Sequence, residues 1–346
     1  MTRKRAGEAK GMLVRERTIA QHRAIYSRWA CDDEQMVGRV RPMEPCPLRT
    51  DFQRDRDRII HCKAFRRMKH KTQCFITPED DHFRTRLTHT MEVAQIARTI
   101  ARALSLNEDL TEAIALGHDL GHTPFGHMGE RILNRLSPGG FSHEMQSLRV
   151  VEVLENDVAG LNLTEAVRDG IAQHPSHGHP ATREGEVVSL SDRIAYINHD
   201  IDDAVRAGVL RLEEIPRGLL DRLGRTHGER VGTMISSVVR YSEDKDDVQM
   251  EPEIWDELMA LRAFMFERVY SRDWANNECR KTHHIVTELV GYYMEHPGQM
   301  PNEYMEIVYR EGTQRGVCDF VACMTDAYAV KTYQKLFIPP FFDGIG

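Results

Sequence analysis

Residues 117–127 read GHDLGHTPFGH, and the His-Asp pair in this stretch decides how the rest of the chain is interpreted. On a regular helix, adjacent side chains point about 100° apart, so His118 and Asp119 can reach one metal ion together only where the helix ends. Gly121 and Pro124 follow and predict that end. A chance His-Asp pair is the alternative in a chain with 17 histidines, but the density of histidines here favours a metal site.

Two further residues complete a set of ligands for a divalent cation. The predicted metal ligands are His89, His118, Asp119 and Asp192. Imidazoles and carboxylates that leave coordination positions open allow a cation to polarise a phosphoryl oxygen and to lower the pKa of bound water. The spacing differs from the HExxH pattern of metalloproteases and from that of a structural zinc site. The set suits manganese, magnesium, iron, cobalt, nickel or zinc, and the sequence does not select among them.

The spacing of apolar residues predicts helices along most of the chain, and strand signals are scarce. After His89, apolar residues recur at separations of three and four as far as Leu104, which predicts one helix. A second helix is expected from Asn107, a good N-cap residue, to His118. The second helix therefore delivers the His-Asp pair at its end.

Later segments continue the helical pattern after two breaks. A short helix, residues 127–135, is expected after the turn at Pro124. Residues 173–186 are rich in Pro and Gly and predict a loop, which a helix over 187–204 follows. The polar residues that share one face of that helix, at spacings of four, are Asp192, Tyr196 and Asp200. We therefore expect an all-α fold.

Composition limits the function classes. The net charge of −7 disfavours nonspecific nucleic-acid binding by the whole molecule. No run of about 18 apolar residues occurs, and the basic start is followed by no signal-peptide core, so we expect a soluble, cytoplasmic protein without a membrane partner. The seven cysteines are scattered, which favours reduced thiols over a disulfide framework.

A basic segment stands out against the acidic background. Residues 49–71 contain nine Lys or Arg and three Asp, a local net charge of +6. Such a concentration suggests an anionic ligand held at one place. The alternative is a solvated helix face on which acidic and basic side chains pair locally.

Five parts of the chain resemble the deoxyguanosine triphosphate triphosphohydrolases, a family of the HD superfamily of phosphohydrolases. The matching segments are RDRDRIIH and AFRRMKHKTQ within residues 54–73, RTRLTHT at 84–90, HDLGHTPFGH at 118–127, DRIAYINHD at 192–200 and MTDAYA at 324–329. Their ordered agreement is far more specific than a His-Asp pair alone. The resemblance implies an HD-domain helical phosphohydrolase core with additional C-terminal helices.

The resemblance also implies an activity, the metal-dependent cleavage of a deoxynucleoside triphosphate at the α-phosphate to give the deoxynucleoside and tripolyphosphate. In this family the positions of His127 and Glu130 form a catalytic pair, and His143 is a further active-site histidine. The chemistry agrees, because the 5′-alkoxide is a poor leaving group and a positioned imidazolium that protonates it is worth roughly 10²–10⁴-fold. The alternatives are that His127 caps a turn and that Glu130 is an ordinary exposed helix residue.

Further positions match residues that hold the substrate in this family. Arg86 and Arg193 match cations near the triphosphate, and either could instead form a surface ion pair. Tyr196 and Asp200 match residues that hold the deoxyribose 3′-OH, although a tyrosine on an apolar stripe is more often part of the core. Gln73 matches a contact to the base or the sugar.

Other histidines have more than one candidate role. His122 is placed with the catalytic group, and three roles stay open for it: stacking on the substrate, hydrogen bonding behind another side chain, or structural support. His174, His177 and His179 lie in the predicted loop. His174 resembles the extra ligands of two-metal HD enzymes, but we expect all three to face solvent.

The expected organisation has three parts. Residues 1–48 form a basic N-terminal linker, residues 49–242 the HD-type metal-dependent core, and residues 243–346 a helical region packed on that core. The acidic stretch 243–247 predicts a surface loop at the last boundary. Family members are generally homo-oligomers, and a nucleotide effector and weak single-stranded DNA binding are further partners that the resemblance allows.

Two other functions compete with dNTP hydrolysis, which could favour dGTP or another dNTP. An HD-type phosphomonoesterase or phosphodiesterase would keep the metal site and cleave a different bond. A nucleotide-sensing or single-strand-binding regulator would keep the scaffold with little turnover. The complete ligand set argues against the regulator, and the basic segment has only Phe52 and Phe65 as aromatic residues for stacking on bases.

Overall fold

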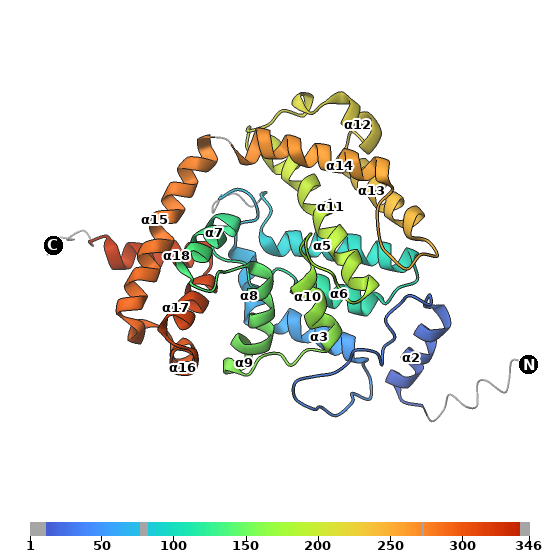
Figure 1. Ribbon diagram of the computed structural model, residues 1–346, viewed down its shortest axis with the longest axis horizontal. Coiled ribbons are helices and arrows are strands. Elements are labelled where there is room, and N and C mark those ends of the chain that lie inside the picture. Colours follow the sequence, from blue (N-terminus) through green and yellow to red (C-terminus); the bar gives the residue numbers. More distant parts are fainter. Residues whose placement is uncertain (1–11, 77–81, 272, 340–346) are drawn as a thin grey trace, which may run out of the picture.

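The computed structural model describes residues 12–76, 82–271 and 273–339, and helices dominate these ranges (Figure 1). The β-pairing found there is one isolated bridge between Thr72 and Thr85. The predicted all-α fold is therefore confirmed. The α-helices are α2 (Val14–Ile25), α3 (Asp51–His61), α4 (Lys63–Arg67), α5 (Arg86–Ala103), α6 (Glu108–Gly117), α7 (Gly126–Leu136), α8 (His143–Arg149), α9 (Glu155–Val158), α10 (Glu165–Gln173), α11 (Arg183–Arg206), α12 (Arg217–Leu223), α13 (His227–Ser242), α14 (Pro252–Met265), α15 (Asp273–Glu295), α16 (Asn302–Glu311), α17 (Thr313–Ala322) and α18 (Asp326–Phe337). Short 3-10 or π turns are η1 (Met68–His70), η2 (Val150–Leu154), η3 (Leu212–Glu214), η4 (Phe266–Tyr270) and η5 (Pro297–Gln299).

A first hydrophobic core forms where α5, α6 and α11 pack against one another in the middle of the molecule (Figure 1). Its centre is fully buried, as the side chains of Ile100, Ile114 and Ile194 from these three helices show. Helices α3 and α10 cover α6 from outside. Burial of such side chains contributes roughly 1.5–3 kcal/mol each, so this core fixes the relative positions of the three helices.

A second core joins α7 to the C-terminal helices α15, α17 and α18. Leu133 of α7 is buried there together with Val286 of α15 and Val321 of α17. Phe125, directly before α7, belongs to the same cluster. The chain therefore leaves the first core at the end of α6 and enters the second core within a few residues.

The predicted start and end of the second helix are confirmed. Asn107 caps α6, since its side chain accepts the N–H of Leu110. The helix ends at Gly117, with His118 as its C-cap. Gly121 has an additional reason to be glycine, because a Cβ there would lie 2.1 Å from the backbone nitrogen of Ser147 in α8.

The predicted loop at 173–186 is longer than the real one. Helix α10 extends to Gln173, and α11 begins at Arg183 rather than Val187. Thr182 caps α11 by accepting the N–H of Gly185. The first turn of α11 carries polar residues, so apolar spacing alone placed the helix start too late.

Several basic side chains of residues 49–71 have partners within the chain. Arg49 contacts Asp57 at 2.6 Å, and Arg56 contacts Asp109 at 3.1 Å. Arg58 donates to the Leu161 carbonyl at 2.8 Å. Arg49 follows the local-pairing alternative, because Asp57 belongs to the same segment. The expectation of one anionic ligand held by the segment stays a prediction.

The expected division at residue 243 stays a prediction, and so does the linker, of which residues 1–11 lie outside the described part. The first core continues across that boundary, because Leu258 and Leu261 of α14 are buried in it. None of the helices described here has the length and apolar character that crossing a membrane requires.

Candidate metal centre and active site

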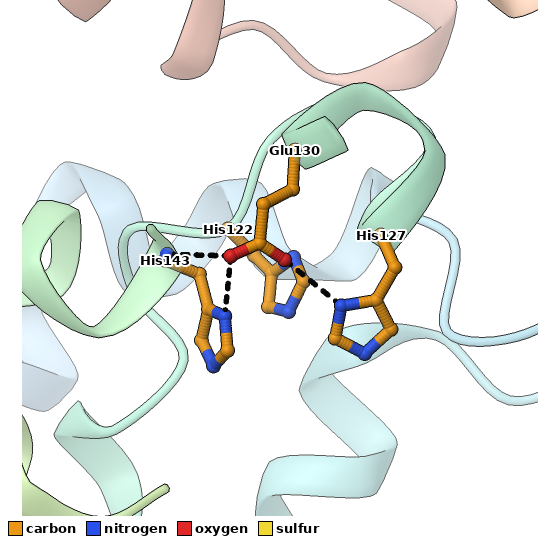
Figure 2. Close-up of side chains that lie close together, drawn as sticks. All are labelled: His122, His127, Glu130 and His143. Atoms are coloured by element: carbon orange, nitrogen blue, oxygen red, sulfur yellow. Dashed lines mark hydrogen bonds and ion pairs between the residues drawn. The ribbon is translucent and has the colours of Figure 1, made fainter. Parts of the chain in front are cut away.

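Glu130 lies at the centre of a group of imidazoles at the start of α7 (Figure 2). Its Oε2 is 2.9 Å from Nδ1 of His127, one turn earlier on the same helix. Its Oε1 is 2.9 Å from Nδ1 of His143 and also accepts the His143 backbone N–H at 2.8 Å. One carboxylate therefore joins α7 to the start of α8 and orients two rings.

The contacts within this group favour a negative Glu130 and a positive His143. Burial alone would raise the pKa of Glu130, but hydrogen bonds from His127 and His143 hold it well below the ordinary value. Burial would lower the pKa of His143, yet the hydrogen bond and charge of Glu130 raise it to about 9. The side chain of His127 is 66% exposed, so this ring is the accessible member of the group.

His122 is the buried member of the same group. Its ring stacks on His143 with centroids 4.4 Å apart and an interplanar angle of 18°. Burial and the nearby charge of Arg86 lower its pKa well below the ordinary value, so the ring is neutral at pH 7. Its backbone carbonyl accepts a hydrogen bond from Lys71, which also donates to the Ala322 carbonyl.

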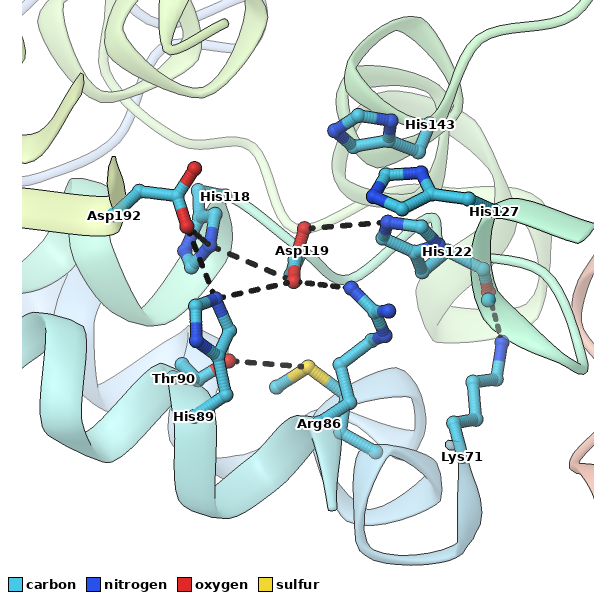
Figure 3. Close-up of polar contacts among 12 residues, drawn as sticks. Lys71, Arg86, His89, Thr90, His118, Asp119, His122, His127, His143 and Asp192 are labelled. Carbon is cyan, nitrogen blue, oxygen red and sulfur yellow. Dashed lines mark hydrogen bonds and ion pairs between the residues drawn. The ribbon is translucent and has the colours of Figure 1, made fainter. Parts of the chain in front are cut away.

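The predicted metal ligands come from three helices of the first core (Figure 3). His89 projects from α5, His118 and Asp119 follow α6, and Asp192 projects from α11. Asp119 Oδ2 lies 3.7 Å from His89 Nε2 and 3.6 Å from His118 Nε2. Asp192 Oδ1 lies 3.1 Å from His89 Nε2 and 4.0 Å from His118 Nε2. The structure thus gathers all four around one point.

The ring nitrogens in this group present lone pairs to that point. His118 Nδ1 donates to the Ala115 carbonyl at 2.7 Å, which leaves Nε2 as the free lone pair. That Nε2 is buried without a hydrogen-bond partner among the described residues. His89 Nδ1 is engaged by His199 Nε2 at 2.8 Å, so its Nε2 also faces the carboxylates. A buried nitrogen lone pair beside two carboxylates fits a divalent cation.

Arg86 lies against the metal ligands and not in an open cleft. Its Nη1 is 2.6 Å from Asp119 Oδ2, and its Nη2 donates to the Thr72 carbonyl at 3.2 Å. Burial alone would raise the pKa of Asp119, but His118 and Arg86 hold it well below the ordinary value. Arg86 is 2% exposed, so in this structure it neutralises the carboxylate.

His174 contradicts the prediction that it faces solvent. It is 2% exposed, and its ring centroid lies 5.0 Å from that of His118 and 5.3 Å from that of His143. The physical reason is that α10 ends at Gln173, so His174 is the C-cap residue of the helix and its side chain turns inward. His177 and His179 are exposed, as expected.

The residues expected to hold the substrate lie farther along α11 and in the segment before residue 77. The Arg193 guanidinium lies over the ring of Trp255 at 4.9 Å, and the Tyr196 hydroxyl accepts from Arg262 at 2.9 Å. The Asp200 carboxylate accepts the hydroxyl of Tyr270. The buried Oε1 of Gln73 lacks a hydrogen-bond partner in the described part of the chain.

Several residues of the site were not singled out from the sequence. His199 lies inside the segment 192–200, so its position next to Asp200 was a usable signal. Lys71 was counted only as part of the basic segment. Tyr270, more than 60 positions downstream of Asp200, carries no local signal at all, because only the tertiary fold brings it to α11.

Comparisons with known proteins match nearly the whole chain. Residues 86–197 match the HD domain, and residues 248–335 match the phosphohydrolase-associated domain. A deoxyguanosinetriphosphate triphosphohydrolase-like protein of Caldanaerobacter subterraneus is 55% identical over 96% of this chain and 98% of that protein. A protein of the same description from Desulfatibacillum aliphaticivorans is 47% identical over 95% of this chain and 99% of that protein. A solved structure of a hypothetical protein from Aquifex aeolicus aligns with a TM-score of 0.48 and 20% identity, covering 84% of this chain and 69% of that one.

Proposed function

Since the chain belongs to the family of deoxyguanosinetriphosphate triphosphohydrolase-like proteins with an HD domain, and is thus a metal-dependent phosphohydrolase, we propose that it hydrolyses deoxynucleoside triphosphates. The bond cleaved joins the α-phosphorus to the 5′ oxygen. Water supplies the new oxygen on phosphorus, and the products are the deoxynucleoside and inorganic tripolyphosphate.

One observation carries this proposal: Glu130 binds His127 and His143 together, and His143 in turn stacks on His122 beside the metal ligands. Protonation of a poor leaving group requires an oriented acid next to the phosphorus, and the accessible ring of His127 meets that requirement. Glu130 holds this ring through Nδ1 and leaves Nε2 free for the substrate oxygen.

The ligand set of His89, His118, Asp119 and Asp192 would hold the divalent cation, which when bound supplies an activated water and polarises a phosphoryl oxygen. His127 then gives its proton to the departing 5′ oxygen. Glu130 stabilises the charged ring before that transfer, and His143 keeps the carboxylate in place.

The substrate contacts belong to the same proposal. Arg86 and Arg193 are the cations for the phosphate oxygens, and Arg86 would share its guanidinium between Asp119 and the substrate. Gln73, Tyr196 and Asp200 face the deoxyribose, with Gln73 supplying an unpartnered buried oxygen. His122 supports His143 by stacking. Preference among bases, homo-oligomer formation, a nucleotide effector and weak single-stranded DNA binding remain predictions of the family resemblance.

The test is to incubate the purified protein with each of the four dNTPs, and with GTP, in Mn²⁺ or Mg²⁺ and to identify the products by ion chromatography. Tripolyphosphate with free deoxynucleoside is the expected result, and the rates rank the bases. Orthophosphate or monophosphate products would indicate the phosphatase or phosphodiesterase alternative. No product from any nucleotide, with metal bound, would favour the regulator.

A further inference from the structure

A chain of buried contacts runs from the predicted metal ligand His89 through His199 to Asp200. His89 Nδ1 lies 2.8 Å from His199 Nε2, and His199 Nδ1 lies 2.9 Å from Asp200 Oδ1. His89 lies on α5, whereas His199 and Asp200 are consecutive residues of α11. The exposed fractions of the three side chains are 1%, 0% and 7%. Water has little access to them, so their polar atoms depend on one another.

The far end of this chain is an acceptor of hydrogen bonds. The carboxylate of an aspartate at pH 7 offers no proton, so a nitrogen that approaches Asp200 Oδ1 must bring one. Neither Oδ1 nor His199 Nδ1 has a hydrogen-bond partner elsewhere among the described residues. The other carboxylate oxygen, Oδ2, accepts the hydroxyl of Tyr270. His199 Nδ1 is therefore the nitrogen that carries the proton.

The proton on His199 determines where His89 holds its own. A neutral imidazole has one N–H, so His199 Nε2 is left as an acceptor, and His89 Nδ1 must be the donor to it. His89 Nε2 then presents a lone pair. It lies 3.1 Å from Asp192 Oδ1 and 3.7 Å from Asp119 Oδ2, where the cation is expected. The opposite tautomers would place a lone pair of His199 2.9 Å from an anionic oxygen.

We propose that His199 is a positioning residue that, together with Asp200, fixes the metal-binding form of His89. The inference rests on the proposed function for the cation at His89 and for the contact of Asp200 with the deoxyribose. Asp200 has two roles in this arrangement, because a carboxylate has lone pairs for more than two hydrogen bonds. It contacts the sugar, and through His199 it orients a ligand of the cation.

The alternative is that His199 only fills space between α5 and α11. An apolar side chain would then serve equally well. The positioning role needs an acceptor toward His89 and a donor toward Asp200, and the amide of glutamine offers both whereas leucine offers neither. His199→Leu and His199→Gln therefore separate the two explanations.

The experiment measures Mn²⁺ affinity by calorimetry on the full-length protein after it has been stripped with chelator. We expect His199→Leu to bind Mn²⁺ about 10–100-fold more weakly than the wild-type protein, the loss typical when a partner behind a metal ligand is removed. His199→Gln should keep most of the affinity. Ile197→Ala is the matched control, because it removes a buried apolar side chain from the same helix and should lower stability without changing the affinity.

Asp200→Ala tests the chain of contacts from its other end, and it keeps the inference testable if His199→Leu does not fold. It should weaken Mn²⁺ binding although Asp200 is not one of the predicted ligands. The double variant His199→Leu/Asp200→Ala should bind Mn²⁺ no more weakly than His199→Leu alone, because Asp200 acts on His89 only through His199.

Four results would each overturn the inference: a wild-type protein that binds no Mn²⁺, wild-type affinity in His199→Leu, equal losses in His199→Leu and His199→Gln, or additive losses in the double variant. The product assay separates this inference from the proposed function. Tripolyphosphate from the wild-type protein, with unchanged affinity in His199→Leu, defeats only the inference. The expected losses of affinity without tripolyphosphate defeat only the function.

Discussion

At the residue scale, the hydrogen bond that each buried histidine makes through Nδ1 determines the role that its Nε2 can take. His118 and His174 use backbone carbonyls for this purpose, and His89 uses His199. The other ring nitrogen is left with a lone pair when its partner nitrogen holds the proton. The hydrogen bond to Ala115 therefore fixes the tautomer of His118 that presents Nε2 toward Asp119 and Asp192.

The proposed function assigns metal binding and proton donation to different residues, so two variants should separate them. Asp119→Ala should lose both metal and turnover, because it removes a buried carboxylate of the predicted ligand set. His127→Ala should keep its metal and lose at least about 10²-fold in rate, since the proposed role of its ring is to donate a proton and not to bind a cation. Metal content by mass spectrometry and steady-state rates measure the two effects.

Arg131→Ala, an exposed change on the same helix as His127, serves as the control for rate. An Asp119→Ala variant with full metal content would remove Asp119 from the ligand set. An unchanged rate in His127→Ala would eliminate its role as the acid.

Gly121 makes a second prediction at this scale. In Gly121→Ala the new Cβ would meet the Ser147 backbone nitrogen at 2.1 Å, so α8 or the loop after His118 must move. We expect a loss of about 1–3 kcal/mol in the free energy of unfolding, measured in denaturant. Gly218→Ala is the matched control, because its Cβ would meet nothing within 4 Å. Equal stabilities of the two variants would contradict the close approach.

At the scale of elements, the first residue of α18 holds the turn before α7, the helix that carries the proposed acid His127. Asp326 Oδ1 accepts the N–H of Phe125 at 2.9 Å, and its Oδ2 accepts the N–H of Thr72 at 2.8 Å. Phe125 has a φ of 63°, an unusual value for a bulky residue, so this turn needs support. Thr72 in turn accepts from Arg86. Helix α18 thus positions α7 without touching the reacting atoms.

Asp326→Ala should consequently lower kcat by about 10-fold or more while the metal content stays that of the wild type, because small displacements of an acid are costly. Lys331→Ala, exposed on the same helix, should leave kcat unchanged. A fall in metal content that parallels the fall in kcat would indicate general disruption and contradict a positioning role.

Elements were predictable where a local signal marks their ends. Asn107 and the glycine-proline turn gave the ends of α6 correctly, because caps and breakers act within a few residues. The start of the loop after α10 was also predictable, since Pro175 and Gly178 placed it at residue 173, where the helix ends. The loop signal did not show that His174, the C-cap residue, is buried, so it was expected at the surface.

At the scale of the whole molecule, the candidate site lies where the two hydrophobic cores meet. The predicted metal ligands lie on α5, directly after α6 and on α11 of the first core, whereas His127 and Glu130 lie on α7, which packs against α15, α17 and α18. The motifs predicted the residues of each half from the sequence. Their separation onto two cores was not predictable, because it depends on contacts such as that of α7 with α15.

Glu184 of α11 links the segment around Cys31 to the start of α6. Its Oε1 accepts the N–H groups of Cys31 and Asn107 at 3.0 and 2.9 Å. Burial raises the pKa of this carboxyl to about 7. The folded protein therefore keeps a proton that the unfolded chain releases near the ordinary value, and stability falls as the pH rises from about 4.5 through about 7.

Glu184→Gln keeps an oxygen for both N–H groups and removes the titration. We expect the wild-type protein to lose on the order of 2–3 kcal/mol relative to this variant between pH 5 and pH 8, measured by denaturant unfolding across that range. Glu165→Gln is a control on a more exposed carboxyl and should follow the wild-type pH profile. Parallel profiles of wild type and Glu184→Gln would contradict a raised pKa.

In the proposed reaction, water attacks the α-phosphorus and the 5′ oxygen leaves with the deoxynucleoside. The most direct measurement is turnover of a dNTP with Mn²⁺ in oxygen-18 water, followed by mass spectrometry of both products. We expect tripolyphosphate that contains the heavy oxygen and an unlabelled deoxynucleoside. Label in the deoxynucleoside, or deoxynucleoside monophosphate with pyrophosphate in place of tripolyphosphate, would contradict it.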